Sequence, residues 1–284
     1  TGTVNVSTGT GNDSITANTN LLASDTINGG ADGTDTLVTT IASVDTTATA
    51  TAFTNISNME RLGISDALAN TLTTSRVQAG LTTVLLTGGG TGTVNLEAGA
   101  KTVSLGAALT GGLTVNDTGV ATNDALTLNS SSTTSLNLGA GNALTIGGFE
   151  TTTISSTVTG AAVGQTYGAI GITPDTGGAV TLNLTGSNNI TIGAVTAASA
   201  TSLTIDASGL TGTAAATIAA PVRTGITTGA TSIVGSANAD TITGSNNNTT
   251  IDGGSGNDGI TAGTGVDSIA GGLGDDTFTF AANL

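Results

Sequence analysis

Aspartate occupies four of five positions that are spaced nine residues apart near the C-terminus, and glycine is frequent at the positions between. Five nine-residue units follow one another without a gap from Gly235 to Thr279. Carboxylate and carbonyl oxygens are the ligands that hard cations prefer, and glycine lets a tight turn point its carbonyls inward. The sixth positions of the units are Asp240, Thr249, Asp258, Asp267 and Asp276. The eighth positions are apolar: Ile242, Ile251, Ile260, Ile269 and Phe278. One apolar residue per unit is typical of a short strand that points a single side chain into a core.

The metal that this pattern favours is calcium. The chain has no Cys and no His, so it lacks the sulfur and nitrogen ligands that zinc and copper prefer. A carbonyl-rich turn is too large for the tight octahedron of magnesium, whereas Ca²⁺ accepts six to eight oxygens at about 2.3–2.6 Å. Carboxylates stacked about 4.8 Å apart also repel one another. A bound cation would offset this repulsion, so that metal binding contributes to folding.

The composition excludes several classes of protein. The 284 residues include only four Lys or Arg against 19 Asp or Glu, and the formal net charge is −15. Four cations provide no basic patch for nucleic acid, and the absence of His excludes a Ser-His-Asp triad. No apolar stretch approaches the roughly 18 residues of a membrane-spanning helix. We therefore expect neither nucleic-acid binding nor membrane insertion, and the lack of an initiator Met indicates a piece of a longer or processed chain.

The five units resemble the nonapeptide G-G-x-G-x-D-x-U-x of the repeats-in-toxin (RTX) family, in which U is a large apolar residue. The resemblance implies a calcium-binding β-roll in which two units form one coil, so that each unit stacks on the next but one. Asp240, Asp258 and Asp276 then share one edge with two calcium sites. Thr249 and Asp267 share the other edge with a weaker site. Carbonyls of the turns complete the implied ligand set, at Gly235, Gly244, Gly253, Gly254, Gly256, Gly263, Gly265, Gly271, Gly272 and Gly274.

Weaker copies of the same unit lie near the N-terminus. Residues 8–15 fit the template, residues 29–37 fit it with one insertion, and residues 25–27 keep its Asp-x-U ending. The expected calcium ligands here are Asp13, Asp25, Gly29, Gly30 and Asp35. The alternative interpretation is a structural turn whose backbone is capped by Asp.

Between the two ends, short apolar-x-apolar units recur at spacings of about 8 to 13 residues. Examples are Val94-Asn95-Leu96, Leu126-Thr127-Leu128 and Leu182-Asn183-Leu184. Each unit is typical of a strand with two side chains inward and one polar side chain outward. The spacing suits either a sandwich or a solenoid, and the nonapeptides in the same chain favour the solenoid.

We therefore predict an all-β fold, a parallel β-solenoid with RTX β-roll coils at the C-terminal end and weaker ones at the N-terminal end. RTX-like turns are expected over residues 1–40 and a connecting segment over residues 41–92. Irregular solenoid coils are expected over residues 93–234 and the RTX β-roll over residues 235–284. Weak helical periodicity predicts one short helix around residues 67–77.

Residues 53–62, 148–154 and 205–210 are similar to connecting segments of RTX-bearing bacterial surface-layer (S-layer) proteins. The similarity implies a secreted, extracellular protein of the bacterial cell surface, exported by a type I system. It also implies self-assembly with copies of the same chain into a calcium-dependent lattice or filament, with a cell-surface polysaccharide as anchor. We interpret Glu60 and Glu150 as caps on local backbone amides rather than as calcium ligands.

Two other functions compete with a structural role. A calcium-rigidified adhesin or ligand-binding module is the main alternative, and its ice-binding form would need a ladder of outward threonines, against which their irregular spacing counts. Those residues are Thr114, Thr127, Thr145, Thr191 and Thr204. A polysaccharide-cleaving enzyme is least favoured because sugar-stacking aromatics are almost absent; its candidate carboxylates are Asp117, Asp124, Asp175 and Asp206. We predict a structural protein that is not an enzyme.

Overall fold

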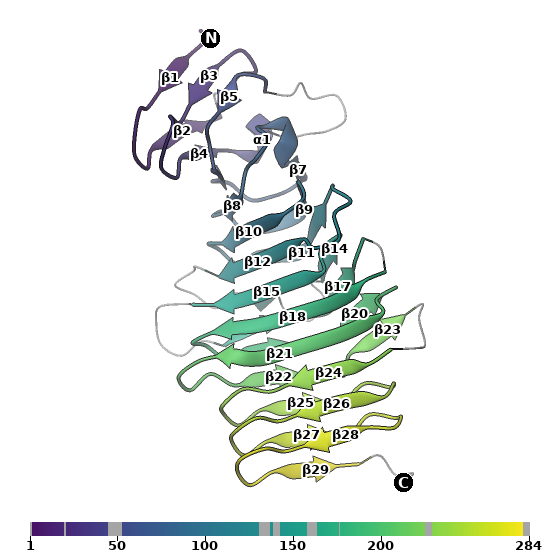
Figure 1. Cartoon of the computed structure of the whole chain (residues 1–284). Helices are drawn as coiled ribbons and strands as arrows, with labels where there is room; N and C mark the ends of the chain where they lie inside the picture. Colours follow the sequence, from purple (N-terminus) through teal and green to yellow (C-terminus); the bar gives the residue numbers. More distant parts are fainter. Residues whose placement is uncertain are drawn as a thin grey trace.

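The strands of the chain stack along one axis into a parallel β-solenoid, with the N-terminal coils at one end and the C-terminal coils at the other (Figure 1). The computed structural model describes residues 2–19, 21–44, 53–130, 137–138, 143–157, 164–175, 177–224 and 229–280. Strands that are neighbours in space come from successive coils and pair in parallel. The predicted all-β fold and parallel solenoid are therefore confirmed, and the sandwich is excluded.

One sheet of 12 strands, which we call the long sheet, runs through the whole stack. It comprises β2 (Ser14–Asn18), β4 (Thr36–Thr39), β6 (Arg61–Ile64), β8 (Thr83–Leu86), β10 (Ala100–Leu105), β12 (Ala125–Ser130), β15 (Thr151–Ser156), β18 (Ala179–Gly186), β21 (Ser202–Leu210), β24 (Thr231–Val234), β26 (Thr249–Asp252) and β28 (Ser268–Ala270). A separate three-stranded sheet, the N-terminal sheet, forms a second side of the first coils. It comprises β1 (Asn5–Ser7), β3 (Thr26–Asn28) and β5 (Ile56–Ser57).

Two sheets of seven strands form the remaining sides. The first seven-stranded sheet comprises β7 (Thr71–Thr73), β9 (Gly90–Leu96), β11 (Leu109–Asp117), β14 (Leu144–Gly147), β17 (Ile170–Thr173), β20 (Val195–Ala198) and β23 (Val222–Thr224). The second seven-stranded sheet comprises β13 (Asn137–Leu138), β16 (Gln165–Tyr167), β19 (Ile190–Ile192), β22 (Ala216–Ile218), β25 (Thr241–Thr243), β27 (Gly259–Thr261) and β29 (Thr277–Thr279). The middle coils thus have three sides, whereas the C-terminal coils alternate between the long sheet and the second seven-stranded sheet.

The C-terminal coils have the register that the nonapeptides predict. Ser232 pairs with Thr250, which pairs with Ser268, on the long sheet. On the opposite side Ile242 pairs with Ile260, which pairs with Phe278. Equivalent residues of successive coils are 18 positions apart. Two nine-residue units therefore make one coil, and each unit stacks on the next but one.

The apolar-x-apolar strands bury their apolar side chains in one continuous core. Leu126 and Leu128 of β12 are buried, while Thr127 between them is only partly covered. The C-terminal coils are poorer in apolar residues, because each unit supplies a single large side chain. Ile251 and Ile260 are buried, but Phe278 of the last unit is 42% exposed. Burial of apolar surface therefore contributes less to these coils than to the three-sided ones.

The helix expected around residues 67–77 does not form. The chain there makes a corner, the strand β7 and a single 3₁₀ turn, η1 (Thr74–Arg76). Leu68 and Leu72 mimic a helical i, i+4 pair, but both are buried because the corner and the strand each point one apolar residue into the core. The short helix of the described chain is α1 (Ile41–Val44), whose first amide donates to Asp66 Oδ1 at 2.7 Å. No helix among the described residues is long and apolar enough to cross a membrane.

Candidate metal centre

The aspartates of alternate nonapeptides lie one above another. The backbone N–H of Asp240 donates to Asp258 Oδ1 at 2.8 Å, and the N–H of Asp258 donates to Asp276 Oδ1 at 3.0 Å. On the opposite edge, the N–H of Thr249 donates to Asp267 Oδ1 at 2.9 Å. The structure therefore stacks Asp240, Asp258 and Asp276 on one edge and Thr249 and Asp267 on the other edge, as the stacking rule predicts.

The same contact recurs along the solenoid. A carboxylate placed next to the start of a strand accepts the N–H of the residue at the equivalent position of the preceding coil. The carboxylates that make this contact are Asp25, Asp35, Glu60, Asp124, Glu150, Asp240, Asp258, Asp267 and Asp276. An amide at the entry to a strand needs a partner, so these acidic residues have a structural role that is independent of any metal.

Asp258 is the member of the stack that this role leaves incomplete. Its side chain is 1% exposed, and Oδ2 is buried without a hydrogen-bond partner. Burial raises the pKa of Asp258; the hydrogen bond from the Asp240 amide opposes the rise, and the nearby charges of Asp240, Asp276 and Asp252 add to it. A buried carboxylate oxygen without a donor calls for a cation or a proton.

The turn around Asp258 fits calcium. A Cβ atom at Gly253 would collide both with Asp258 Oδ2 and with the carbonyl oxygen of Gly271 in the next coil. The two oxygens therefore converge over a residue that has no side chain. Carboxylate and carbonyl oxygens from adjacent turns are the donor set that Ca²⁺ prefers.

Asp240 is better satisfied than Asp258. Its carboxylate accepts hydrogen bonds from the backbone N–H of Ser236, from the Ser236 hydroxyl at 2.9 Å and from the N–H of Ala216 at 2.6 Å. Thr249, on the other edge, is 2.7 Å from the Ser245 hydroxyl and donates to the carbonyl of Asn247. In the two units that have Ser at the second position, this Ser therefore forms hydrogen bonds with the sixth residue of the same unit. The later units lack this Ser, so their aspartates need a cation more.

The remaining nonapeptide glycines permit close stacking of the turns. A positive φ is found at Gly254, Gly256, Gly265, Gly272 and Gly274. A Cβ atom at Gly272 would collide with the carbonyl of Gly254. Gly235, Gly244, Gly263 and Gly271 have no room for a Cβ either.

Replacing one of these glycines tests how tightly the turns stack. Gly254 and Gly212 both have a positive φ, of 97° and 67°, but only Gly254 has a neighbour, the Ser236 carbonyl, in the space of a Cβ. Gly212→Ala should cost about 1–2 kcal/mol for the left-handed backbone alone. Gly254→Ala should cost about 2 kcal/mol more because the coils must separate. Thermal melting at one calcium concentration measures the difference, and equal melting temperatures would contradict the stacking.

The N-terminal residues divide between the two interpretations of the sequence. Asp25 accepts the amide of Val4 in the preceding coil at 2.9 Å and the amide of Leu22 in its own turn at 2.8 Å, so backbone amides satisfy both of its oxygens. Asp35 has the same arrangement as Asp258, with one oxygen on an amide of the preceding coil and the other beside a glycine. Its Oδ1 accepts the N–H of Asp13 at 2.8 Å, and a Cβ at Gly29 would lie 2.6 Å from its Oδ2.

Asp13 and Gly30 also resemble residues of the C-terminal turns. Asp13 Oδ2 is buried without a hydrogen-bond partner. A Cβ at Gly30 would collide with the carbonyl of Gly9 in the preceding coil, so Gly30 permits close stacking there. Asp13 and Asp35 therefore remain the N-terminal candidates for a calcium site.

Glu60 and Glu150 cap backbone amides, as expected, but the amides are not local. Glu60 Oε2 accepts the N–H of Asp35 at 2.7 Å, and Glu150 Oε2 accepts the N–H of Asp124 at 3.0 Å. The partners lie 25 and 26 residues earlier in the chain. No sequence signal identifies this contact, because it depends on the length of each coil.

Comparisons with protein-family models, with curated proteins and with solved structures gave no match to this chain. The resemblance to RTX and surface-layer proteins therefore rests on the nonapeptides and connecting segments themselves.

Proposed function

We propose that the protein is a structural component of an extracellular bacterial surface layer or filament, and that calcium between stacked nonapeptide turns locks its C-terminal coils. The observation that carries the proposal is the Asp240–Asp258–Asp276 stack, in which Asp258 Oδ2 is buried without a partner. A divalent cation between Asp258 and Asp276 would satisfy that oxygen and neutralise the stacked charge.

The electrostatics of the whole chain support a calcium-dependent fold. Its 19 acidic residues face four basic ones, so the compact state carries strong self-repulsion. In an exported chain, the C-terminal coils would remain unfolded where calcium is scarce and would fold outside the cell, where calcium is abundant. Binding energy of this kind appears directly as folding energy.

Self-association with copies of the same chain is the proposed use of this rigid rod. Repetitive coils present the same surface many times along one axis, which suits a lattice or filament more than a single catalytic site. The proposed anchor is a cell-surface polysaccharide, and the proposed location is the bacterial cell surface.

Electron microscopy of the purified chain tests the assembly. In millimolar calcium we expect ordered sheets or filaments, and in chelator we expect dispersed particles, because the calcium-free coils no longer present a fixed surface. Magnesium at the same concentration is the control and should not replace calcium. Dispersed particles in calcium at high protein concentration would contradict the proposal.

An adhesin with an ice-binding face is the second candidate, and the sheet register favours it more than the sequence did. The five threonines that an ice-binding ladder would need are divided among three sheets: Thr114 and Thr145 pair on the first seven-stranded sheet, and Thr191 lies on the second. The long sheet instead aligns a column of hydroxyls that the sequence spacing conceals. This column is Thr151, Thr181, Thr204, Ser232, Thr250 and Ser268.

The same purified protein separates the two candidates. A hydroxyl every 4.8 Å or so along the sheet would inhibit the recrystallisation of ice if this face binds ordered water. Inhibition by dispersed particles would favour the adhesin, whereas ordered assemblies without inhibition would favour the surface layer.

A further inference from the structure

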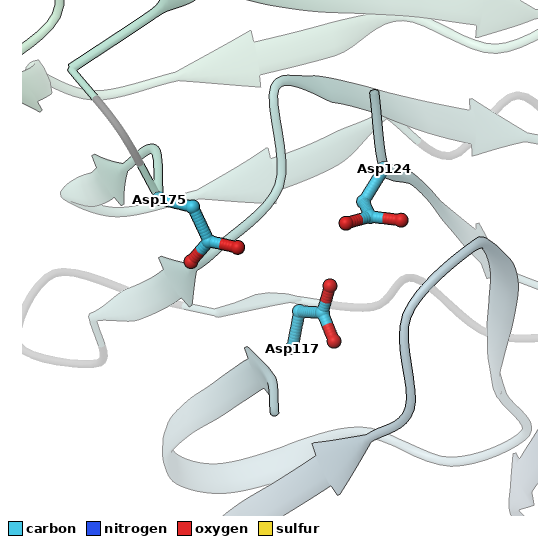
Figure 2. A group of neighbouring side chains, drawn as sticks. All are labelled: Asp117, Asp124 and Asp175. Atoms are coloured by element: carbon cyan, nitrogen blue, oxygen red, sulfur yellow. The ribbon is translucent and has the colours of Figure 1, made fainter. Parts of the chain in front are cut away.

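Three acidic side chains meet at one corner of the three-sided coils. Asp117 ends β11, Asp124 precedes β12, and Asp175 lies in the turn between β17 and β18. One carboxylate oxygen from each lies within 4.8 Å of the other two. Figure 2 shows the three carboxylates converging from separate segments of the chain. All three lie outside the nonapeptides.

The carboxylates of Asp117 and Asp124 are held in matching ways. Asp117 Oδ1 accepts the N–H of Gly119 at 2.7 Å, and Asp124 Oδ1 accepts the N–H of Gly99. The second oxygen of each, Oδ2, is buried without a hydrogen-bond partner. The Asp124 side chain is 2% exposed, so water cannot hydrate it freely. Each residue therefore keeps one buried oxygen unsatisfied within a cluster of acidic neighbours.

The corner between β14 and β15, which contains Gly148 and Glu150, positions the three aspartates and leaves the space between them open. Glu150 accepts the N–H of Asp124 at 3.0 Å with Oε2 and the N–H of Asp175 at 3.3 Å with Oε1, so it ties the two backbones together. Gly148, with φ of 82°, leaves the space between Asp117 and Asp175 open. A Cβ there would lie 2.9 Å from Asp175 Oδ1 and 2.9 Å from the Cβ of Asp117.

The electrostatic cost of this arrangement is visible at Asp117. Burial raises its pKa to about 6; the Gly119 amide opposes the rise, and Asp124 and Asp175 add to it. Carboxylates that cannot separate must share a proton or bind a cation. Two oxygens on one Ca²⁺ at about 2.3–2.6 Å lie no more than about 5 Å apart, and the three oxygens here meet that limit.

We propose that Asp117, Asp124 and Asp175 bind one calcium ion, which fastens the corner of three successive coils. All the donors are oxygens, which favours Ca²⁺ over zinc or copper. Asp175 is exposed, so water reaches the site and completes the coordination shell. The site is independent of the nonapeptide stack and does not require the chain to assemble.

Calcium titration of the full chain by calorimetry at neutral pH tests this site. Asp175→Asn removes one ligand charge at an exposed position, so the variant should fold. Asp117→Asn removes a second, more enclosed charge. Each should weaken one class of site by on the order of tenfold or more, or remove one ion from the stoichiometry. Asp206→Asn is the matched control, since Asp206 lies in β21 and its Oδ1 caps Ser208.

Three outcomes decide the proposal. Loss of one ion in Asp175→Asn, with the count unchanged in Asp206→Asn, would support it. Unchanged affinity and stoichiometry in both Asp175→Asn and Asp117→Asn would overturn it and leave a shared proton as the role of the cluster. Asp258→Asn, which affects the nonapeptide stack, should retain this ion, so failure of the proposed function is distinguishable from failure of this site.

Discussion

Removal of calcium should unfold the coils of residues 235–279 while the three-sided coils stay folded. The C-terminal units each supply at most one large apolar residue to the core and carry stacked carboxylates, so a bound ion would supply a large part of their stability. Calcium at about one hundred times its Kd stabilises a site by about 2.7 kcal/mol. Amide hydrogen exchange in β26 to β29 should therefore accelerate by about a hundredfold in chelator.

The strands β21 and β22 provide the internal reference, because their inward residues include the buried Leu203, Ile205 and Ile218. Their exchange should change little in chelator. Acidification should partly restore protection in the C-terminal coils. Burial raises the pKa of Asp258 and Asp240, so the folded coils retain protons that the unfolded chain has released, and stability rises as the pH falls through these values. Equal exchange in calcium and in chelator would show that no ion holds these coils.

Asp258→Asn should be the most damaging of three charge-removing substitutions in the nonapeptides. Asp258 lies between Asp240 and Asp276 in the stack, and its unpartnered Oδ2 is buried. Asn keeps the Oδ1 that accepts the Asp240 amide, so the substitution tests the charge rather than the cap. Calcium affinity should fall by about tenfold or more.

Two matched variants set the scale. Asp276→Asn should weaken only one site, because Asp276 has a stacked carboxylate on one side. Asp267→Asn should matter least, because Thr249 opposite it already bonds within its own turn. Calorimetric titration of the three variants gives the order. Equal losses at all three positions would mean that the assignment of ligands to edges is wrong.

The regular parts of the fold were predictable because their period is constant. A nine-residue unit with one apolar position fixes both the strand and the 18-residue coil, so the partners of Asp258 followed from counting. The same argument placed Leu126 and Leu128 in the core, since period-2 strands alternate between faces.

The irregular coils could not be predicted in this way because their lengths differ. The register between Thr151, Thr181 and Thr204 depends on the turns between the strands, so the hydroxyl column of the long sheet was missed. The sequence offers Asp117, Asp124 and Asp175 only as candidate carboxylates of an enzyme, because their proximity depends on the stacking of three coils of unequal length. Leu68 and Leu72 show the converse error, in which a corner imitates a helical period.

A crystal structure of the chain grown in millimolar calcium would test the central claim most directly. Anomalous scattering from calcium should lie between the stacked turns, within about 2.6 Å of oxygens of Asp258 and Asp276. Well-ordered C-terminal coils with only water at these carboxylates would contradict it, and would leave amide capping as the whole role of the aspartate stack.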